Sequence, residues 1–137
     1  MVTQMSAKRA MAQATVLVVE DTPSEMALMS HYLQEGGYSV IGAPSGKEGL
    51  DKAIAQKPDV VVTDIVMPGI SGFELCRKLK RQPETSQVPV VLCSSKKQNV
   101  DRLWGMRQGA HAYLTKPYTR DELLTAVEQA LEQALSI

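Results

Sequence analysis

The sequence predicts an α/β domain with three layers, in which helices cover both faces of a doubly wound, parallel (βα)5 sheet. Two features of the chain support this prediction. Five short runs rich in Val, Ile and Leu are each followed by a segment of helix length, and most of these runs are continuously apolar, as in strands buried on both faces. Strands that alternate with helices form right-handed βαβ units. We therefore expect a parallel sheet with strand order 2-1-3-4-5.

The predicted strands follow one another without a long linker or a sequence repeat. A chain of 137 residues is long enough for one domain with a single hydrophobic core. We expect residues 1–14 to form a frayed or partly helical tail and residues 15–137 to form the domain. The strands are TVLVVE (15–20), YSVIG (38–42), DVVVTD (59–64), VPVVLCS (88–94) and HAYLT (111–115).

Each predicted helix begins at a capping sequence. In a capping box, a Ser or Thr side chain accepts a hydrogen bond from the backbone N–H three residues later, and a Glu or Gln at that position reaches back. Such a pair follows every predicted strand, and Gly or Pro residues mark the helix ends. The pairs are Thr22–Glu25, Ser45–Glu48, Ser71–Glu74, Ser95–Gln98 and Thr119–Glu122, and the stops are Gly36-Gly37, Lys57-Pro58, Gln82-Pro83 and Gly109.

The composition argues against several classes of function. The 15 basic and 15 acidic residues leave no net charge, so nothing favours a nucleic acid or an anionic membrane as a partner. No apolar run approaches the ~20 residues of a membrane span, and the N-terminus lacks the apolar core of a signal peptide, so we expect a cytoplasmic protein. Cys76 and Cys93 lie in apolar segments without CxxC spacing, which predicts buried free thiols.

Polar side chains collect where the predicted strands end. Glu20 and Asp21 end the first strand, Asp64 ends the third, Ser94 ends the fourth and Lys116 follows the fifth. The carboxyl ends of parallel strands share one edge of the sheet, where ligands bind. Acids at strand ends often only cap turns, but the presence of the complete set favours a functional site.

The predicted group of carboxylates requires a compensating cation or proton. Two unit charges ~4 Å apart repel each other by about 4 kcal/mol at an effective dielectric constant of about 20. Oxygen ligands without His or Cys suit Mg²⁺, which also binds phosphate oxygens. A carboxylate beside Mg²⁺, a hydroxyl and an ammonium is equipped to accept a phosphoryl group as a nucleophile, while the cations stabilise charge on the phosphoryl oxygens.

Four segments of the chain are similar to those of a known family. They are VLVVED, VVVTDIVMPGISGFEL, PVVLCSS and GAHAYLTKPY. Together they resemble the receiver domain of response regulators in two-component signalling, of the stand-alone CheY type, from about Thr15 to Leu135. The resemblance implies a flavodoxin-like fold. The segment SSKKQNVDRLWGMRQGAHAYLTKP is further similar to PilH-like regulators of type IV pilus motility and phototaxis in bacteria.

The resemblance assigns roles to the acidic residues. It implies that Glu20, Asp21 and Asp64 bind Mg²⁺, or alternatively Mn²⁺, together with the backbone carbonyl of Val66. It also implies that Asp64 accepts the phosphoryl group. Glu20 departs from the commoner Asp of the family, so we expect the metal geometry to differ by one methylene.

A second group of residues is implied to transmit the phosphorylation. The Ser94 hydroxyl, where the family frequently has Thr, would swing toward the phosphoryl group. Tyr113 on the next strand would then rotate inward as the aromatic switch. Lys116 would contact the acid site, aimed by a cis peptide bond to Pro117. The inward rotation of Tyr113 would change the face formed by the fourth predicted helix, the fifth strand and the fifth helix.

The function implied is that of a single-domain response regulator. A histidine kinase or phosphotransfer protein would donate the phosphoryl group to Asp64, and the protein would catalyse its own phosphorylation and dephosphorylation without being a conventional enzyme. Its output would be phosphorylation-dependent binding of a protein target. Two alternatives remain: a small Mg²⁺-dependent phosphohydrolase, which lacks a second acid where Val66 stands, and a phosphate-independent binding module, which the complete acid, hydroxyl and Lys set disfavours.

Several other residues have structural interpretations. We expect His31 and His111 to have a surface or hydrogen-bonded structural role rather than to bind metal. Trp104 falls on the apolar stripe of its predicted helix, where core packing is favoured over contact with a partner. Lys96 lies near enough to the acid edge to affect water attack on a phosphoryl group.

Overall fold

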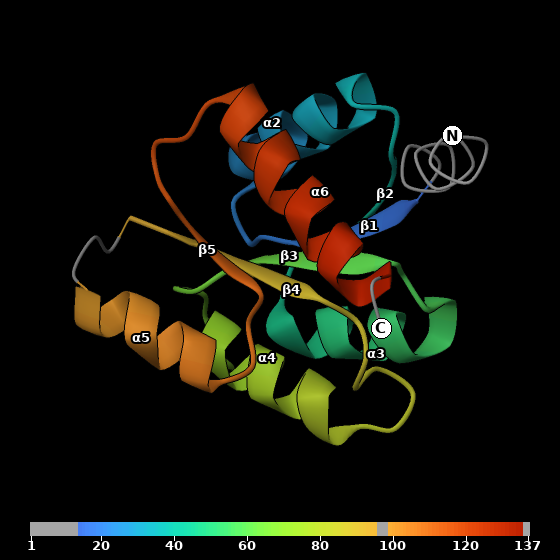
Figure 1. Ribbon diagram of the computed structural model, residues 1–137, viewed down its shortest axis with the longest axis vertical. Helices are drawn as coiled ribbons and strands as arrows, with labels where there is room; N and C mark the ends of the chain where they lie inside the picture. The colour runs from blue at the N-terminus through green and yellow to red at the C-terminus, as the bar shows by residue number, and fades with distance from the viewer. Residues whose placement is uncertain (1–13, 96–98, 136–137) are drawn as a thin grey trace.

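Five parallel strands form a sheet between two layers of helices (Figure 1). The computed structural model describes residues 14–95 and 99–135. The strand order is β2-β1-β3-β4-β5, and every neighbouring pair is parallel, as predicted. The strands are β1 Thr15–Val19, β2 Ser39–Ala43, β3 Val60–Asp64, β4 Val90–Ser94 and β5 Ala112–Thr115; the helices are α2 Pro23–Glu35, α3 Gly46–Gln56, α4 Gly72–Arg81, α5 Asn99–Arg107 and α6 Arg120–Leu135.

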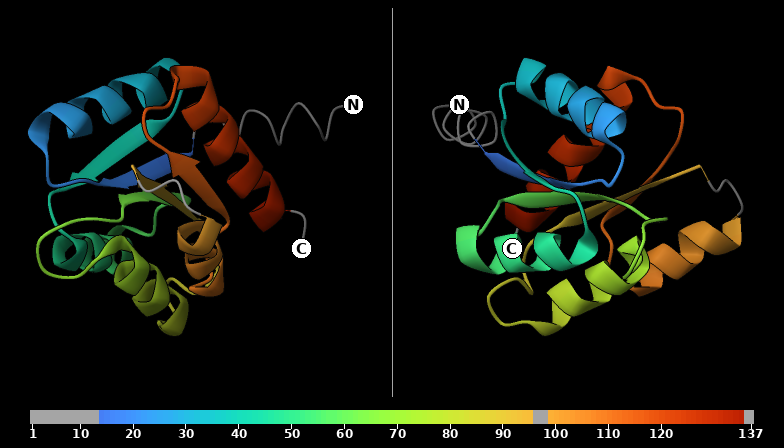
Figure 2. Two further views of the ribbon diagram at one scale, coloured as in Figure 1. Left: turned by 90° about the vertical axis from the view of Figure 1, so that its left-hand side faces the viewer. Right: turned by 180° about the vertical axis from the view of Figure 1, so that it is seen from behind.

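The helices divide between the two faces of the sheet. Helices α2 and α6 cover one face, and α3, α4 and α5 cover the other (Figures 1 and 2). Successive residues of a strand point to opposite faces, so Val16 and Val18 of β1 join one apolar core, whereas Leu17 and Val19 join the other. This two-sided burial explains the continuous apolar runs of the sequence. Among the described residues, no helix is both long and apolar enough to cross a membrane.

In three of the predicted capping boxes, the cap side chain accepts the expected hydrogen bond from the backbone N–H three residues later. They are Ser45–Glu48, Ser71–Glu74 and Thr119–Glu122. The structure confirms Thr22 as the N-cap residue of α2, but the Thr22 side chain makes no cap hydrogen bond, so the predicted capping box is not formed. The reason is that the Glu25 carboxylate pairs with Lys116, while the Thr22 N–H donates to Glu20 Oε1 at 3.2 Å. The remaining pair includes Gln98, which lies outside the described residues.

The prediction that Trp104 packs in the core is also wrong. Helix α5 lies close to the sheet at Gly105, where a Cβ atom would stand 2.8 Å from Leu92 Cδ1. Because a glycine faces the core here, the neighbouring Trp104 side chain points outward and is half exposed. Leu103 and Val100 are exposed as well, so α5 presents an apolar outer surface.

The remaining predictions for single residues have mixed outcomes. Cys76 and Cys93 are buried and free, as predicted. His31 is largely exposed and lies 3.4 Å from Glu35. The Nδ1 atom of His111 is buried without a hydrogen-bond partner in the described part of the chain, so the hydrogen-bonded role expected of this side chain is not seen. Lys96 and most of the predicted tail, residues 1–13, lie outside the described residues.

Gly72 sets how closely α4 approaches the end of β3. Its N–H donates a hydrogen bond of 2.8 Å to the Ile65 carbonyl. A Cβ atom at this position would clash with the Asp64 carbonyl oxygen and would lie 2.8 Å from Ile65 Cα. Both neighbours are backbone atoms that cannot rotate away, so a larger residue would displace Asp64.

We expect Gly72→Ala to lower the free energy of unfolding by roughly 1–3 kcal/mol, because the added methyl overpacks a rigid contact. Gly42→Ala is the matched control, since its Cβ would meet the flexible side chain of Met26, 3.2 Å from Sδ. We expect the control to change the stability by less than about 1 kcal/mol. Urea unfolding measures both values, and equal losses in the two variants would contradict the close contact at Gly72.

Candidate functional site

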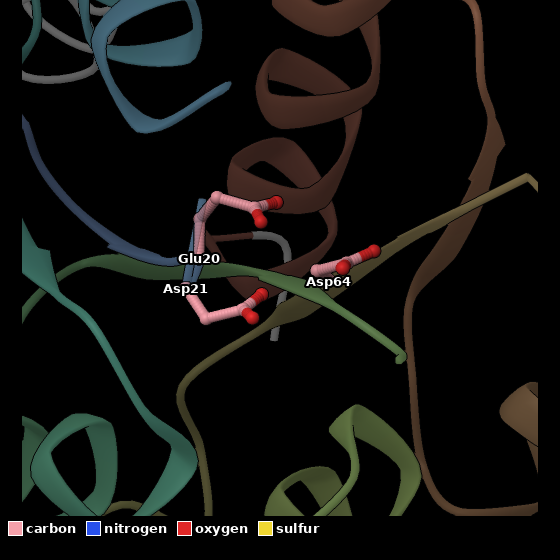
Figure 3. Close-up of side chains that lie close together, drawn as sticks. All are labelled: Glu20, Asp21 and Asp64. Atoms are coloured by element: carbon pink, nitrogen blue, oxygen red, sulfur yellow. The ribbon is translucent and has the colours of Figure 1, made fainter. Parts of the chain in front are cut away.

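Three carboxylates meet at the carboxyl edge of β1 and β3. Asp64 is the last residue of β3, and Glu20 and Asp21 come directly after β1. Val19 pairs with Thr63, so the strand register places Glu20 next to Asp64. One ligand oxygen from each acid lies within 4.8 Å of the others, and the three side chains lie close together in Figure 3. The structure therefore brings together the acids that the sequence predicted.

Lys116 reaches the acids from the end of β5. Its backbone N–H donates a hydrogen bond of 2.8 Å to the Ser94 carbonyl. Its side-chain Nζ lies 3.2 Å from Asp64 Oδ1 and 3.4 Å from Glu20 Oε2. The peptide bond between Lys116 and Pro117 is cis, which confirms the expectation from the resemblance.

A fourth carboxylate, which the sequence did not predict, lies beside Lys116. Glu25 Oε2 is 3.0 Å from Lys116 Nζ, closer than either Asp64 or Glu20. Its position three residues after Thr22 indicates a capping role instead. The sequence feature that could have indicated a place near the acid site is that Glu25 lies in the first turn of α2, which follows directly after the Glu20–Asp21 pair.

Burial and like charges oppose ionisation of the acids. The Glu20 side chain is completely buried. Burial raises its pKa to about 7 against the opposing hydrogen bond from Thr22, and the charge of Asp64 adds to the increase. Burial likewise raises the pKa of Asp64, although Lys116 opposes the shift. Burial alone would lower the pKa of Lys116, but its carboxylate neighbours, above all Glu25, raise it above the ordinary value.

The residues fit a bound divalent cation. Among the described residues, the three clustered carboxylates and Glu25 outnumber the single ammonium of Lys116 that contacts this group. The clustered ligand atoms are carboxylate oxygens, the type that Mg²⁺ and Mn²⁺ bind. Asp21 is the most exposed of the three acids. Val66 stands two residues beyond Asp64 with its side chain exposed, and its backbone carbonyl stays a predicted ligand.

Ser94 and Tyr113 lie on adjacent strands next to the acid site. Ser94 is the last residue of β4 and is fully buried, and Tyr113 is buried on β5. Their side chains share a hydrogen bond. The Arg102 guanidinium lies over the Tyr113 ring, 5.4 Å from its centroid. The ring therefore already occupies the inward position that the resemblance associates with phosphorylation.

A groove of about 570 Å³ lies between α5, β5 and α6. Its wall includes Arg102 and Met106 from α5, Tyr113 from β5 and Gln129 from α6. The exposed apolar side chains of α5, among them Trp104, lie on the same helix. The face that the sequence predicted for partner binding is therefore hollowed and partly apolar.

Comparison with known proteins identifies relatives over most of the chain. Residues 16–128 match the response regulator receiver domain family. The chain is 43% identical to Protein PilH of Pseudomonas aeruginosa over 86% of this chain and 98% of that protein. It is 34% identical to the transcriptional regulatory protein PhoP of Bacillus subtilis over 87% of this chain, but it spans 49% of PhoP. The solved structure of chemotaxis protein CheY4 from Vibrio cholerae has a TM-score of 0.82 at 31% identity and covers 86% of this chain and 98% of its own.

Without metal, we expect the protein to become less stable as the pH rises. The pKa of Glu20 is raised from 4.5 to about 7 in the folded state, so the folded chain binds more protons over this interval and its free energy of unfolding decreases with rising pH. Asp64 acts in the same direction. Glu20→Gln cannot ionise, so it should exceed wild type in stability by roughly 3 kcal/mol at pH 8 and by less than about 1 kcal/mol at pH 5.

Urea unfolding in excess EDTA at both pH values measures this difference. Glu84→Gln, an exposed acid in the loop between α4 and β4, is the control and should keep the wild-type pH dependence. If Glu20→Gln shows the same pH dependence as wild type, burial of the Glu20 charge does not destabilise the fold.

Proposed function

The chain belongs to the response regulator receiver domain family, and we propose that it acts as a phosphorylation-controlled switch with Asp64 as the phosphoryl acceptor. The observation that supports Asp64 is its place between the Glu20–Asp21 pair and Lys116. Glu20 also contacts Lys116 but is completely buried, whereas the Asp64 side chain keeps 11% exposure beside the ammonium. Among the three acids of the cluster, Asp64 is thus the one that combines access for a donor with a contact to the Lys116 ammonium.

In the proposed reaction, an Asp64 carboxylate oxygen attacks the phosphorus of a phosphohistidine on a histidine kinase or phosphotransfer protein. The bond from phosphorus to the donor nitrogen breaks, and the group remains on Asp64 as an acyl phosphate. Lys116 lies close enough to balance the charge of the transferred oxygens. Glu20, Asp21 and Asp64, with the Val66 carbonyl, would hold Mg²⁺ or Mn²⁺, which supplies further positive charge to those oxygens.

Attack of water on the acyl phosphate would release inorganic phosphate and restore the Asp64 carboxylate. The protein would therefore catalyse its own phosphorylation and dephosphorylation, and it would not turn over a small substrate as a conventional enzyme does. The proposed output is binding of a downstream protein at the groove between α5, β5 and α6. Ser94 and Tyr113, which share a hydrogen bond, would connect this groove to the acceptor.

The identity to PilH over nearly all of that protein supports a pathway in pilus motility; phototaxis is the alternative that the sequence resemblance implies. We place the protein in the cytoplasm, where a histidine kinase could reach Asp64. The balanced charge of the chain supports a protein target rather than a nucleic acid or a membrane.

Asp64→Asn should fold but gain no phosphoryl mass from acetyl phosphate and Mg²⁺, because a neutral amide is a poor nucleophile. Wild type should gain the mass of a phosphoryl group, and excess EDTA should prevent the gain. Intact mass spectrometry measures both. Asp51→Asn, an exposed acid of α3, is the matched control and should label like wild type. Labelling of Asp64→Asn at the wild-type rate would show that the acceptor lies elsewhere.

Ser94→Ala should still be phosphorylated but should transmit the change poorly, because the hydroxyl that shares a hydrogen bond with Tyr113 is lost. The readout is the set of backbone amide NMR shifts around the groove, recorded before and after addition of beryllofluoride and Mg²⁺. We expect shifts at Met106, Tyr113 and Gln129 in wild type and much smaller shifts in Ser94→Ala. Ser94→Thr keeps a hydroxyl and should restore them. Equal shifts in wild type and Ser94→Ala would exclude Ser94 as the relay.

A further inference from the structure

Glu25 makes a contact that its local sequence does not explain. It stands in the first turn of α2, three residues after Thr22, where a glutamate usually completes a capping box. The Thr22 side chain makes no cap hydrogen bond, and the Glu25 carboxylate lies 3.0 Å from Lys116 Nζ. This is the shortest of the three ion pairs that Lys116 makes with described residues. Helix α2 is therefore tied to the acid site through this contact.

We propose that Glu25 competes with the phosphoryl group on Asp64 for Lys116, and thereby limits how tightly the site holds a phosphoryl group. Glu25 is a positioning residue in this proposal, because it acts through Lys116. The inference rests on the proposed role of Asp64 as the acceptor.

The hydrogen-bonding capacity of Lys116 creates the competition. A lysine ammonium has three N–H donors, and three carboxylates lie within 3.4 Å of Lys116 Nζ. Phosphoryl oxygens on Asp64 gain a full hydrogen bond from Lys116 when one of these carboxylates gives up its own bond.

Burial identifies Glu25 as the carboxylate that is displaced. The Glu20 side chain is completely buried, and a buried carboxylate that loses its partner has a large desolvation penalty. The Glu25 side chain is 43% exposed, so water can replace the lysine. Glu25 also lines a pocket of about 340 Å³ together with Leu28 and Tyr118, which leaves room for its side chain to move away from Lys116.

The negative charge of Glu25 also weakens binding of a phosphoryl group, in addition to the competition for Lys116. It places a negative charge next to a site that already contains three carboxylates, and a phosphoryl group adds more. Gln has nearly the same shape as Glu but no charge. Because hydrogen bonds to a charged acceptor are stronger than bonds to a neutral one, Glu25→Gln should release Lys116 more readily.

The test is the affinity of the Mg²⁺-saturated protein for beryllofluoride, an anionic mimic of the phosphoryl group, measured by fluorine NMR. We expect Glu25→Gln to bind it roughly three- to tenfold more tightly than wild type. The gain should shrink at ~1 M salt, because a half-exposed charge is screened. Glu35→Gln is the matched control on the same helix; Glu35 pairs with Arg120 at 3.6 Å, and its loss should leave the affinity unchanged.

Equal affinities in wild type and Glu25→Gln would overturn the proposal. Weaker binding by Glu25→Gln would also overturn it, since Glu25 would then support Lys116 in the phosphorylated state. A wild-type protein that binds no beryllofluoride would overturn the assignment of Asp64 and the inference with it, so the two failures are distinguishable. The nitrogen NMR signal of the Lys116 ammonium in metal-free protein tests the contact itself. It should shift in Glu25→Gln but not in Glu35→Gln, and an unchanged signal in Glu25→Gln would contradict the ion pair.

Discussion

Negative charge buried at the carboxyl edge of the sheet is the constraint on which the site depends. Glu20 is completely enclosed and Asp64 nearly so, and burial raises the pKa of both carboxyl groups. Such groups remain ionised in a folded chain when positive charge lies beside them, and here Lys116 shares one ammonium among three carboxylates. The unmatched charge explains why this edge suits a divalent cation. It also explains why an added phosphoryl group would change which partners Lys116 keeps.

The parallel sheet makes this concentration of charge possible. The order β2-β1-β3-β4-β5 places the ends of β1 and β3 side by side and leaves β5 close enough for a long lysine side chain to reach them. Two apolar clusters, one on each face, hold the strands in place. Because these clusters stabilise the fold without any contribution from the acids, the edge can carry groups whose burial by itself opposes folding.

The layers, strand order and acid cluster were predictable from the sequence because they follow from local patterns combined with topology. Glu25 was not, because a side chain in the first turn of α2 can serve a local cap or a distant ammonium. The cap contributes about 1 kcal/mol, and a charge-assisted bond contributes a similar amount or more, so the choice depends on where Lys116 lies. The prediction that Trp104 packs in the core was wrong for a related reason. Helical periodicity placed it on an apolar stripe, but the close approach at Gly105 decided which side of α5 faces the sheet.

Two side-chain pairs adjoin the acid site, Ser94–Tyr113 and Lys116–Glu25. Only the first has the arrangement that we associate with phosphorylation. Tyr113 is inward and bonded to Ser94, as the resemblance associates with phosphorylation, while Lys116 remains on Glu25, as we expect without a phosphoryl group. Under the roles proposed for them, the inward ring of Tyr113 does not require Lys116 to leave Glu25. A phosphoryl group that favours the inward ring of Tyr113 would raise the population of a conformation that is already present. The size of the change is limited by the difference between its affinities for the conformations with the ring inward and outward. The strength of the Lys116–Glu25 pair then sets part of that differential affinity, because phosphoryl oxygens gain the ammonium only after Glu25 releases it.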